Sequence, residues 1–172
     1  MTTIEQDPHR LEMTVLMTPD MANFSGKVHG GALLNLLDRV AFSCASRYSK
    51  QYAVTLSVDQ VLFKEAIQVG ELVTFRASIN DTGRTSMEVG IRVEAENIRS
   101  GQRRHTNSCY FTMVAVDEAG RPVRVPAGTR PLSFAAPCAA NLRNGWNPWR
   151  RPVTTSKFRE PAEWRRSTPM TA

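Results

Sequence analysis

A short stretch of the chain concentrates residues that can bind or polarise a carbonyl group. It has the sequence PDMANFSGKVHGG, ends at Gly31 and leads directly into an apolar segment. Backbone N–H groups in the first turn of a helix have no internal acceptor, and the helix dipole adds positive charge there. Because Gly30 and Gly31 lack side chains, a carbonyl oxygen can approach this backbone as it would an oxyanion hole. The same pair of glycines also suits an ordinary tight turn.

Three polar side chains in and after this stretch are candidates for acid–base or binding chemistry. Asp38 falls on the shoulder of a predicted apolar helix face, where it can activate a water or pair with an Arg. Asn23 can hold a water or a carbonyl, and it can equally cap a turn. His29 can bind a carbonyl oxygen, act as a base, or simply pack and donate to the backbone. Position alone leaves each of these interpretations open.

A second polar group joins two predicted strands farther along the chain. Gly83 is followed by Arg84, Thr85 and Ser86, and this combination of a cation and hydroxyls suits a phosphate or an amide-bearing ligand. The same residues also form an ordinary hairpin loop. No serine lies in a G-x-S-x-G motif, so we expect no nucleophilic triad. The three cysteines and three histidines lack metal-ligand spacing, which predicts free thiols and no metal site.

One helix and several strands must position these residues. Apolar residues at three- and four-residue spacing predict a helix over 32–48, with Leu34, Leu36 and Ala45 widening its apolar face. Alternating and β-branched residues predict strands at 10–18, 53–63, 71–80, 85–98 and 105–117. Turn signals between the later segments favour antiparallel hairpins. The predicted fold class is α+β, with long strands curled around one apolar helix.

Composition and charge limit the class of protein. A length of 172 residues suggests one domain. No apolar run is long enough to span a bilayer and the N-terminus lacks signal-peptide features, so we expect a cytoplasmic protein. Residues 1–120 hold 12 Lys/Arg and 14 Asp/Glu, whereas residues 121–172 hold 10 and 2. The basic, Pro-rich end can meet nucleic acid, acidic lipid or a phosphorylated ligand, or it can be a solvated tail.

Taken together, these residues resemble the acyl-CoA hydrolase family of hotdog-fold thioesterases. The run PDMANFSGKVHGGALLNLLDRVAFSCASR is similar to the opening of that family. VTLSVDQVLFKEAIQVGE and GRTSMEVGIRVEAEN resemble its next two signatures, and CYFTMVAVDEAGRPVRVP resembles its final strand. The resemblance covers residues 8–130, which we take as the domain. Residues 131–172 are expected to be a partly ordered tail without a counterpart, and Ala66 stands where the family often has Pro.

The resemblance implies a hotdog fold, in which a long helix is wrapped by an antiparallel sheet. It implies that two copies pair edge to edge, often as a trimer of such dimers. It implies hydrolysis of acyl-CoA thioesters to a fatty acid and coenzyme A, without a metal or a cofactor. We therefore expect an acyl-CoA substrate and a homo-oligomer, and neither a nucleic acid nor a membrane as partner.

The same resemblance assigns roles to individual residues. The family's catalytic Asn and Asp correspond to Asn23 and Asp38, which act across the dimer interface. Gly30 and Gly31 correspond to the helix start that receives the thioester carbonyl, next to His29 as a substrate-binding residue. The loop from Arg84 to Ser86 corresponds to the segment along the coenzyme A arm.

Two other functions compete with hydrolysis. Enoyl-CoA hydratases share the fold but resemble one another through Asp or His pairs, so the combination of Asn23 and Asp38 favours hydrolysis. An acyl-CoA-binding sensor without enzymatic activity fits the basic tail. The sequence contains no helix-turn-helix motif that would support such a sensor.

Overall fold

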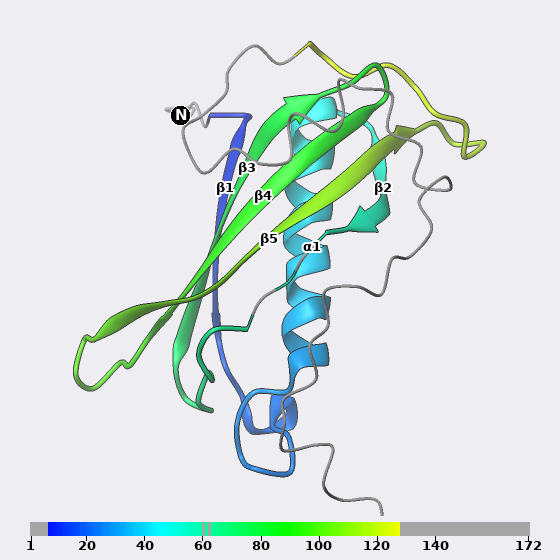
Figure 1. Cartoon of the computed structure of the whole chain (residues 1–172). Helices are drawn as coiled ribbons and strands as arrows, with labels where there is room; N and C mark the ends of the chain where they lie inside the picture. The colour runs from blue at the N-terminus through cyan, green and yellow to red at the C-terminus, as the bar shows by residue number, and fades with distance from the viewer. Residues whose placement is uncertain (1–6, 60, 62, 128–172) are drawn as a thin grey trace, which may run out of the picture. The chain divides into compact units, whose positions relative to one another are not determined.

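The computed structural model describes residues 7–59, 61 and 63–127. Over these residues the chain forms one α-helix, one short 3-10 helix and five strands (Figure 1). Their bounds are β1 (Arg10–Leu16), η1 (Pro19–Met21), α1 (Gly30–Ser49), β2 (Tyr52–Val58), β3 (Leu72–Thr82), β4 (Ser86–Glu96) and β5 (Arg103–Val116). The predicted tail at 131–172 lies outside the described residues.

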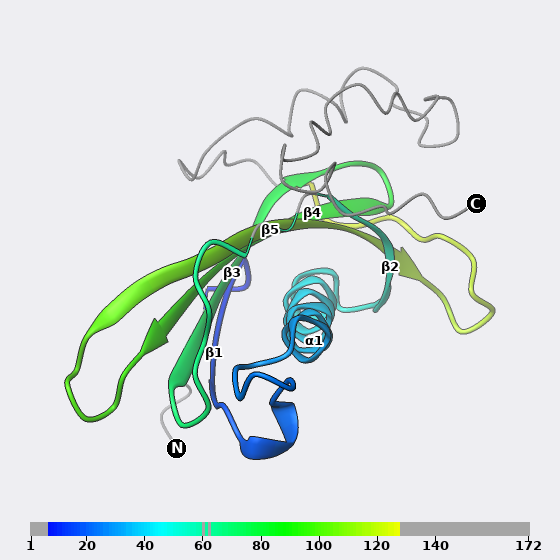
Figure 2. The same ribbon diagram turned by 60° about the horizontal axis from the view of Figure 1, so that its bottom comes forward.

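The five strands form a single antiparallel sheet in the order β1-β3-β4-β5-β2. Seen nearly along the helix axis, the sheet curls over α1, with β1 on one flank and β2 on the other (Figure 2). This is the predicted hotdog architecture. The long, right-twisted strands can cover only one side of a helix, so the opposite side of α1 is left open.

Helix α1 forms because its apolar residues recur on one side and its two ends are capped. Nine residues of the helix are buried, and these include the predicted face of Leu33, Leu37, Val40, Ala41 and Cys44. The helix ends at the left-handed Lys50 (φ 58°), whose N–H donates to the carbonyl of Ser46. Two residues later β2 begins, so the helix and this strand leave a common tight turn.

The inner faces of the strands supply the other half of the core. Strand β4 alternates as predicted, with five residues at most 2% exposed on one side: Met87, Val89, Ile91, Val93 and Ala95. Strands β3 and β5 contribute large fully buried side chains, notably Phe75 and Phe111. Cys44 and Cys109 are free thiols in this core, and burial raises the pKa of each to about 12. The predicted buried thiols are therefore confirmed for these two, while Cys138 lies outside the described residues.

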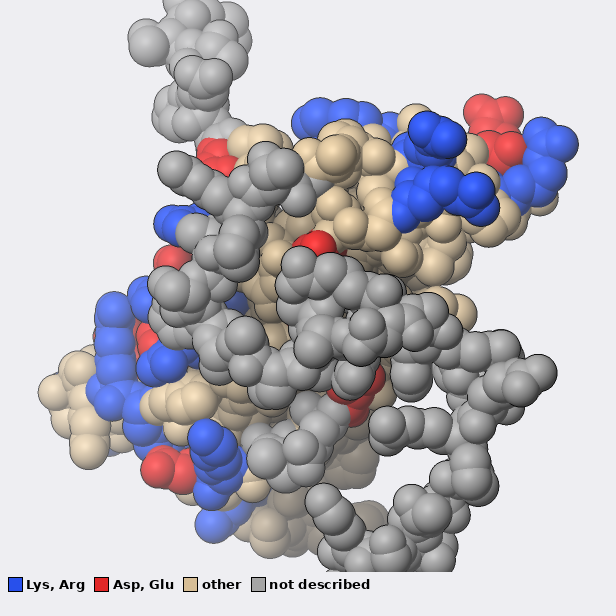
Figure 3. All heavy atoms as spheres, turned by 45° about the horizontal axis from the view of Figure 1, so that its top comes forward, with Lys and Arg blue, Asp and Glu red and all other residues tan. Residues whose placement is uncertain are grey.

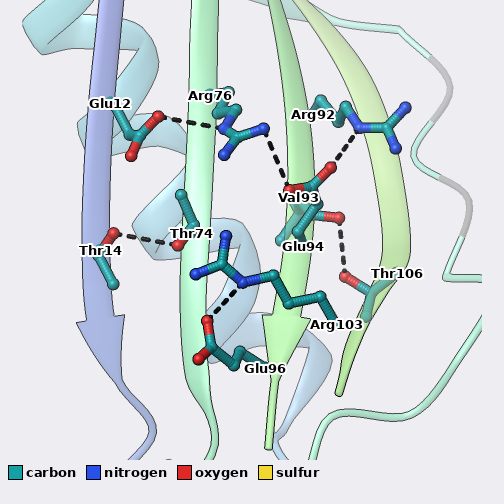
Figure 4. A network of polar contacts seen from close by, with 10 residues as sticks. All are labelled: Glu12, Thr14, Thr74, Arg76, Arg92, Val93, Glu94, Glu96, Arg103 and Thr106. Carbon is teal, nitrogen blue, oxygen red and sulfur yellow. Dashed lines mark hydrogen bonds and ion pairs between the residues drawn. The ribbon is translucent and has the colours of Figure 1, made fainter. Parts of the chain in front are cut away.

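The outer face of the sheet carries a ladder of polar contacts (Figure 4). Arg76 pairs with Glu12 at 3.1 Å and with Glu94 at 3.3 Å, and Arg92 pairs with Glu94 at 2.8 Å. Such exposed pairs contribute little stability each, but their presence identifies the face that meets water. The side of the fold available for an apolar substrate is therefore the side of the helix.

Two sequence-based predictions were wrong in detail. The second strand ends at Val58 instead of residue 63. After Val58 the regular pairing with β5 is replaced by isolated backbone hydrogen bonds, from Asp59 N–H to the Tyr110 carbonyl and from Lys64 N–H to the Thr106 carbonyl. This strand also pairs with β5 and not with the strand that follows it. Leu34 is 39% exposed because it lies outside the helix face that the sheet covers.

No helix within the described residues is long and apolar enough to span a membrane.

An ion pair fixes the segment before β3 to the start of β5. Arg104 donates to both carboxylate oxygens of Glu71 at 2.7 Å, and the Glu71 side chain is only 6% exposed. The hydrogen bond from Arg104 lowers the pKa of Glu71 below the ordinary value of a glutamate, 4.5. Because the folded-state pKa is depressed, this pair stabilises the fold above about pH 4.5 and loses its effect as the pH falls through the folded-state pKa.

We expect Glu71→Gln to lower the free energy of unfolding at pH 7 by about 2 kcal/mol, because a neutral amide with one acceptor oxygen replaces the carboxylate that accepts two hydrogen bonds from Arg104. The deficit should shrink below pH 4.5. Urea denaturation at pH 7 and at low pH measures both effects. The matched control is Glu65→Gln, since Glu65 also pairs with Arg104, at 3.2 Å, but is 54% exposed. That variant should change stability by less than about 1 kcal/mol; equal losses in both variants would contradict this account.

Candidate active site

The loop before α1 is shaped by Asn23. Its Oδ1 accepts hydrogen bonds from Ser25 N–H at 2.9 Å, Ser25 Oγ at 2.8 Å and Lys27 N–H at 3.1 Å. The residue therefore does cap a turn. Since Oδ1 is occupied, the Nδ2 group remains to donate to a ligand, and no acceptor for it is found among the described residues. Asn23 is thus held in place at one end of its amide and open at the other.

His29 is the N-cap of α1. Its Nδ1 accepts a hydrogen bond from Gly31 N–H at 2.9 Å. A neutral ring that accepts at Nδ1 carries its proton on Nε2, so the exposed edge of His29 is a donor. In this arrangement the free ring nitrogen of His29 can donate a hydrogen bond and has no lone pair to accept a proton. The capping role was not predicted from the sequence, because His is not among the usual N-cap residues.

Gly30 and Gly31 differ in how much room the structure leaves for a side chain at each position. A Cβ at Gly31 would lie 2.9 Å from both Cε1 and Nδ1 of His29, so a side chain there would push the ring off the helix end. A Cβ at Gly30 would meet only the Phe63 ring, at 3.7 Å, which is an ordinary contact. With Gly31 N–H bound to His29, the N–H groups of Gly30 and Ala32 are the first-turn donors without an acceptor in the described part of the chain. These two groups are the candidates for an oxyanion hole.

Asp38 lies on the open side of the helix and is exposed in the single chain. Thr55 of β2 donates its hydroxyl hydrogen to Asp38 Oδ1 at 2.6 Å. The described residues provide no cation within ion-pair distance, so the alternative of a simple Asp–Arg pair is not supported. Thr55 was missed from the sequence, where it is one of several β-branched residues in a predicted strand. Only the tertiary contact between α1 and β2 distinguishes it.

Asp38 stands on the wall of an open hollow of about 820 Å³, which we call the Asp38 hollow. Its walls come from α1, β1, the first half of β2 and Met21 of η1, and most of the side chains that line it are apolar. A carboxylate beside an apolar surface suits a substrate with an apolar group next to the bond that reacts. Within the described residues, no cluster of three or more His, Cys, Asp or Glu side chains has the geometry to hold a metal ion.

The predicted hairpin with Arg84, Thr85 and Ser86 joins β3 to β4, and Ser86 is the first residue of β4. All three of its carbonyls are in use: that of Arg84 accepts from Val125 N–H at 3.1 Å, that of Thr85 from Ala115 N–H at 3.0 Å and that of Ser86 from Gly83 N–H at 2.8 Å. The Arg84 side chain is exposed, and no ion pair holds it among the described residues. The hairpin is therefore pinned through its backbone and presents its cation to solvent.

A single chain does not bring the predicted site residues together. Asp38 follows Gly30 by eight positions, which corresponds to about 12 Å along a helix. The Asn23 loop lies at the N-terminal end of α1, and the hairpin with Arg84 lies toward the other end (Figure 1). One small ligand group cannot contact the helix start and Asp38 of the same chain at once.

Comparison with known proteins places the chain in a family. Residues 25–102 match the model of the thioesterase superfamily. The chain is 56% identical over 120 residues to protein VdlD of Helicobacter pylori, covering 70% of this chain and 68% of that protein. The structure of an apo hexameric acyl-CoA thioesterase aligns with a TM-score of 0.67 at 39% identity, covering 69% of this chain and 76% of the other.

A second structural neighbour has been solved both unchanged and with single residues replaced. The acyl-CoA hydrolase of Staphylococcus aureus, solved with butyryl coenzyme A and coenzyme A, aligns with a TM-score of 0.65 at 26% identity, covering 69% of this chain and 72% of the other. Structures of that enzyme have also been solved with one Asn, one Asp or one Thr replaced by Ala. Those three positions are 15 and then 17 residues apart. The same intervals separate Asn23, Asp38 and Thr55.

The different roles of the two glycines predict different costs of substitution. Both Gly30→Ala and Gly31→Ala gain the same helix propensity, but only Gly31→Ala displaces the His29 cap. We expect Gly31→Ala to be less stable than Gly30→Ala by about 1 kcal/mol, the usual value of an N-cap. Thermal or urea unfolding at one protein concentration measures the difference. The difference in stability between the two glycine variants should vanish when each is made separately in a His29→Ala background. A difference that persists in this background would show that the His29 cap is not its cause.

Proposed function

Because this chain belongs to the thioesterase superfamily and shares the hotdog fold with acyl-CoA thioesterases, we propose that it hydrolyses acyl-CoA thioesters to free fatty acid and coenzyme A. The observation that carries the proposal is the contact of Asp38 with Thr55 at the wall of an apolar hollow. A fixed carboxylate next to an apolar surface is what activation of a water beside an acyl group requires.

The proposed mechanism uses groups of the chain alone. The N–H groups of Gly30 and Ala32 bind the thioester oxygen and stabilise the negative charge that develops on it. Asp38 accepts a proton from water as the water oxygen attacks the acyl carbon. The carbon–sulfur bond then breaks, and the thiolate takes up the proton that Asp38 holds. Asn23 donates through Nδ2 to the thioester or the attacking water, and Thr55 orients Asp38. These steps require no metal or cofactor.

The site is proposed to form between two copies of the chain, because about 12 Å separate the helix start from Asp38 within one copy. Strand β2 is an edge of the sheet, and its exposed residues are largely apolar: Tyr52, Val54, Leu56 and Val58. An exposed apolar edge favours pairing with another strand. A twofold-related copy that continues the sheet at β2 reverses the second helix, so that its Asn23 and Gly30 can approach Asp38 of the first.

The higher assembly and the coenzyme A arm complete the proposal. We infer a trimer of such dimers, since a hexamer is described for the thioesterase that is 39% identical. The exposed Arg84, with the hydroxyls of Thr85 and Ser86, would bind the phosphate-bearing arm of the substrate. Basic and acidic side chains are interleaved on the face seen in Figure 3, an arrangement that does not favour a nucleic-acid partner. We also propose a cytoplasmic location, because the proposed substrate, acyl-CoA, is available there.

Replacement of the general base gives the most direct test. Asp38→Asn retains an acceptor for the Thr55 hydroxyl, so the fold should persist, but it removes the proton acceptor. We expect kcat to fall by about 10²–10⁴-fold. Release of free thiol from acyl-CoAs between acetyl and palmitoyl measures it.

Full activity in the variant would contradict the assigned mechanism. Tight binding without hydrolysis by the parent would indicate a sensor, and water addition to an enoyl-CoA would indicate a hydratase.

A mixing experiment tests whether the site is shared between copies. Asn23→Ala and Asp38→Asn should each be nearly inactive alone. When they are co-expressed in equal amounts, half of the dimers contain one chain of each kind, and each such dimer has one intact site. Recovery of about a quarter of the parental activity is therefore expected for a twofold-symmetric site. Activity no higher than that of the separate variants would place Asn23 and Asp38 in one chain.

A further inference from the structure

We propose that Phe42 and Tyr52 form the closed end of the acyl-binding site and restrict the enzyme to short acyl groups. This inference rests on the proposed function, because it assumes that the thioester carbon lies beside Asp38. It assigns the residues that determine chain length, which the catalytic groups themselves do not reveal. Both aromatic side chains line the Asp38 hollow together with Asp38 and Thr55.

The position of Phe42 follows from the helix. It is four residues after Asp38, so the two side chains lie on the same side of α1, one turn apart, at a spacing of about 6 Å along the axis. An acyl group attached at the carbon that Asp38 serves can follow the helix toward its C-terminal end. The first large apolar side chain that it meets on this side is Phe42, which is half-buried.

The position of Tyr52 follows from the turn. Helix α1 ends and strand β2 begins at the same tight turn at Lys50, so the space between them ends at that turn. Tyr52 is the first residue of β2, three positions before Thr55 and on the turn side of it. The ring centroids of Phe42 and Tyr52 are 5.2 Å apart with an angle of 62° between the planes, an edge-on contact. The two rings therefore lie edge-on at the turn end of this space, with Tyr52 still 63% exposed in the single chain.

The chemistry of the remaining wall suits an alkyl group and little else. Ala53 and Val54 continue the apolar surface along β2. The hydroxyl of Ser43 donates to the carbonyl of Arg39 at 2.8 Å, so it offers no free donor to a substrate. Arg39 also lines the hollow, but its side chain is exposed at the rim. An alkyl group would thus bury its surface against the aromatic pair without leaving a polar group unpaired.

The distance to the aromatic pair, and not the total volume, sets the limit on the acyl group. The volume of about 820 Å³ belongs to one chain that is open on one side, where the second copy would enter. The path from Asp38 to Phe42 is only about one helical turn. Short straight acyl groups fit this path, whereas long ones require that the rings be removed or displaced.

The test compares changes of opposite sign. The parent should show its highest kcat/KM with acetyl- to butyryl-CoA. Phe42→Ala should raise the ratio of kcat/KM for octanoyl-CoA over butyryl-CoA by about tenfold or more, mainly through KM. Tyr52→Ala, made separately at the more exposed of the two rings, should raise the same ratio. Phe42→Trp should lower the same ratio. Opposite shifts of one ratio cannot arise from general destabilisation, which lowers turnover of every substrate alike.

A matched control is Ile98→Ala, since Ile98 is 56% exposed, lies on the connection between β4 and β5 and is absent from the walls of the Asp38 hollow. It should leave the octanoyl-to-butyryl ratio unchanged. A parent that prefers palmitoyl-CoA, or variants at residues 42 and 52 that keep the parental ratio, would overturn this inference while the proposed hydrolysis stands. A parent that hydrolyses none of the acyl-CoAs would overturn both.

Discussion

The burial of one helix by one sheet is the constraint on which the rest of this structure depends. Five antiparallel strands curl over α1 and bury a single side of it, and no second layer covers the other side within the described residues. Hydrophobic burial therefore fixes the rotation of the helix about its axis, since Leu37, Val40 and Cys44 are all fully buried. Once the rotation is fixed, Asp38 must lie on the open side. The position of the carboxylate is thus a consequence of packing.

The start of the helix shows how a backbone feature becomes a binding site. His29 occupies the end of α1 through Nδ1, and the missing side chain of Gly31 is what makes room for the ring. The cap consumes one first-turn N–H and leaves its neighbours at Gly30 and Ala32 without acceptors. Asn23 uses a similar arrangement, because its Oδ1 holds the loop while Nδ2 stays open. In both cases one end of a polar side chain forms a hydrogen bond within the chain, and the other end remains available to a ligand.

The remaining geometry explains why a single chain is incomplete. The donors at the helix start and the carboxylate at Asp38 belong to one rigid helix, so no local motion can bring them together. Completion by a second copy across the apolar edge of β2 would resolve this separation. The tight turn between α1 and β2 has a further effect, because it holds Thr55 against Asp38 and Phe42 against Tyr52. One connection thereby arranges both the proposed base and the proposed limit on acyl length.

The sequence by itself determined the local features of this protein. The period of Leu33, Leu37 and Val40 predicted the helix, the alternation from Met87 to Ala95 predicted a half-buried strand, and the run from Asn23 to Gly31 indicated the binding loop, because each depends on neighbours in the chain. It could not place β2 at the far edge beside β5, nor select Thr55 from other β-branched residues, nor assign different roles to Gly30 and Gly31. Those outcomes depend on contacts between segments distant in sequence, such as Asp38 with Thr55. Only the tertiary structure decided them, because the direction of a side chain relative to a distant partner is set by how the whole sheet packs on the helix.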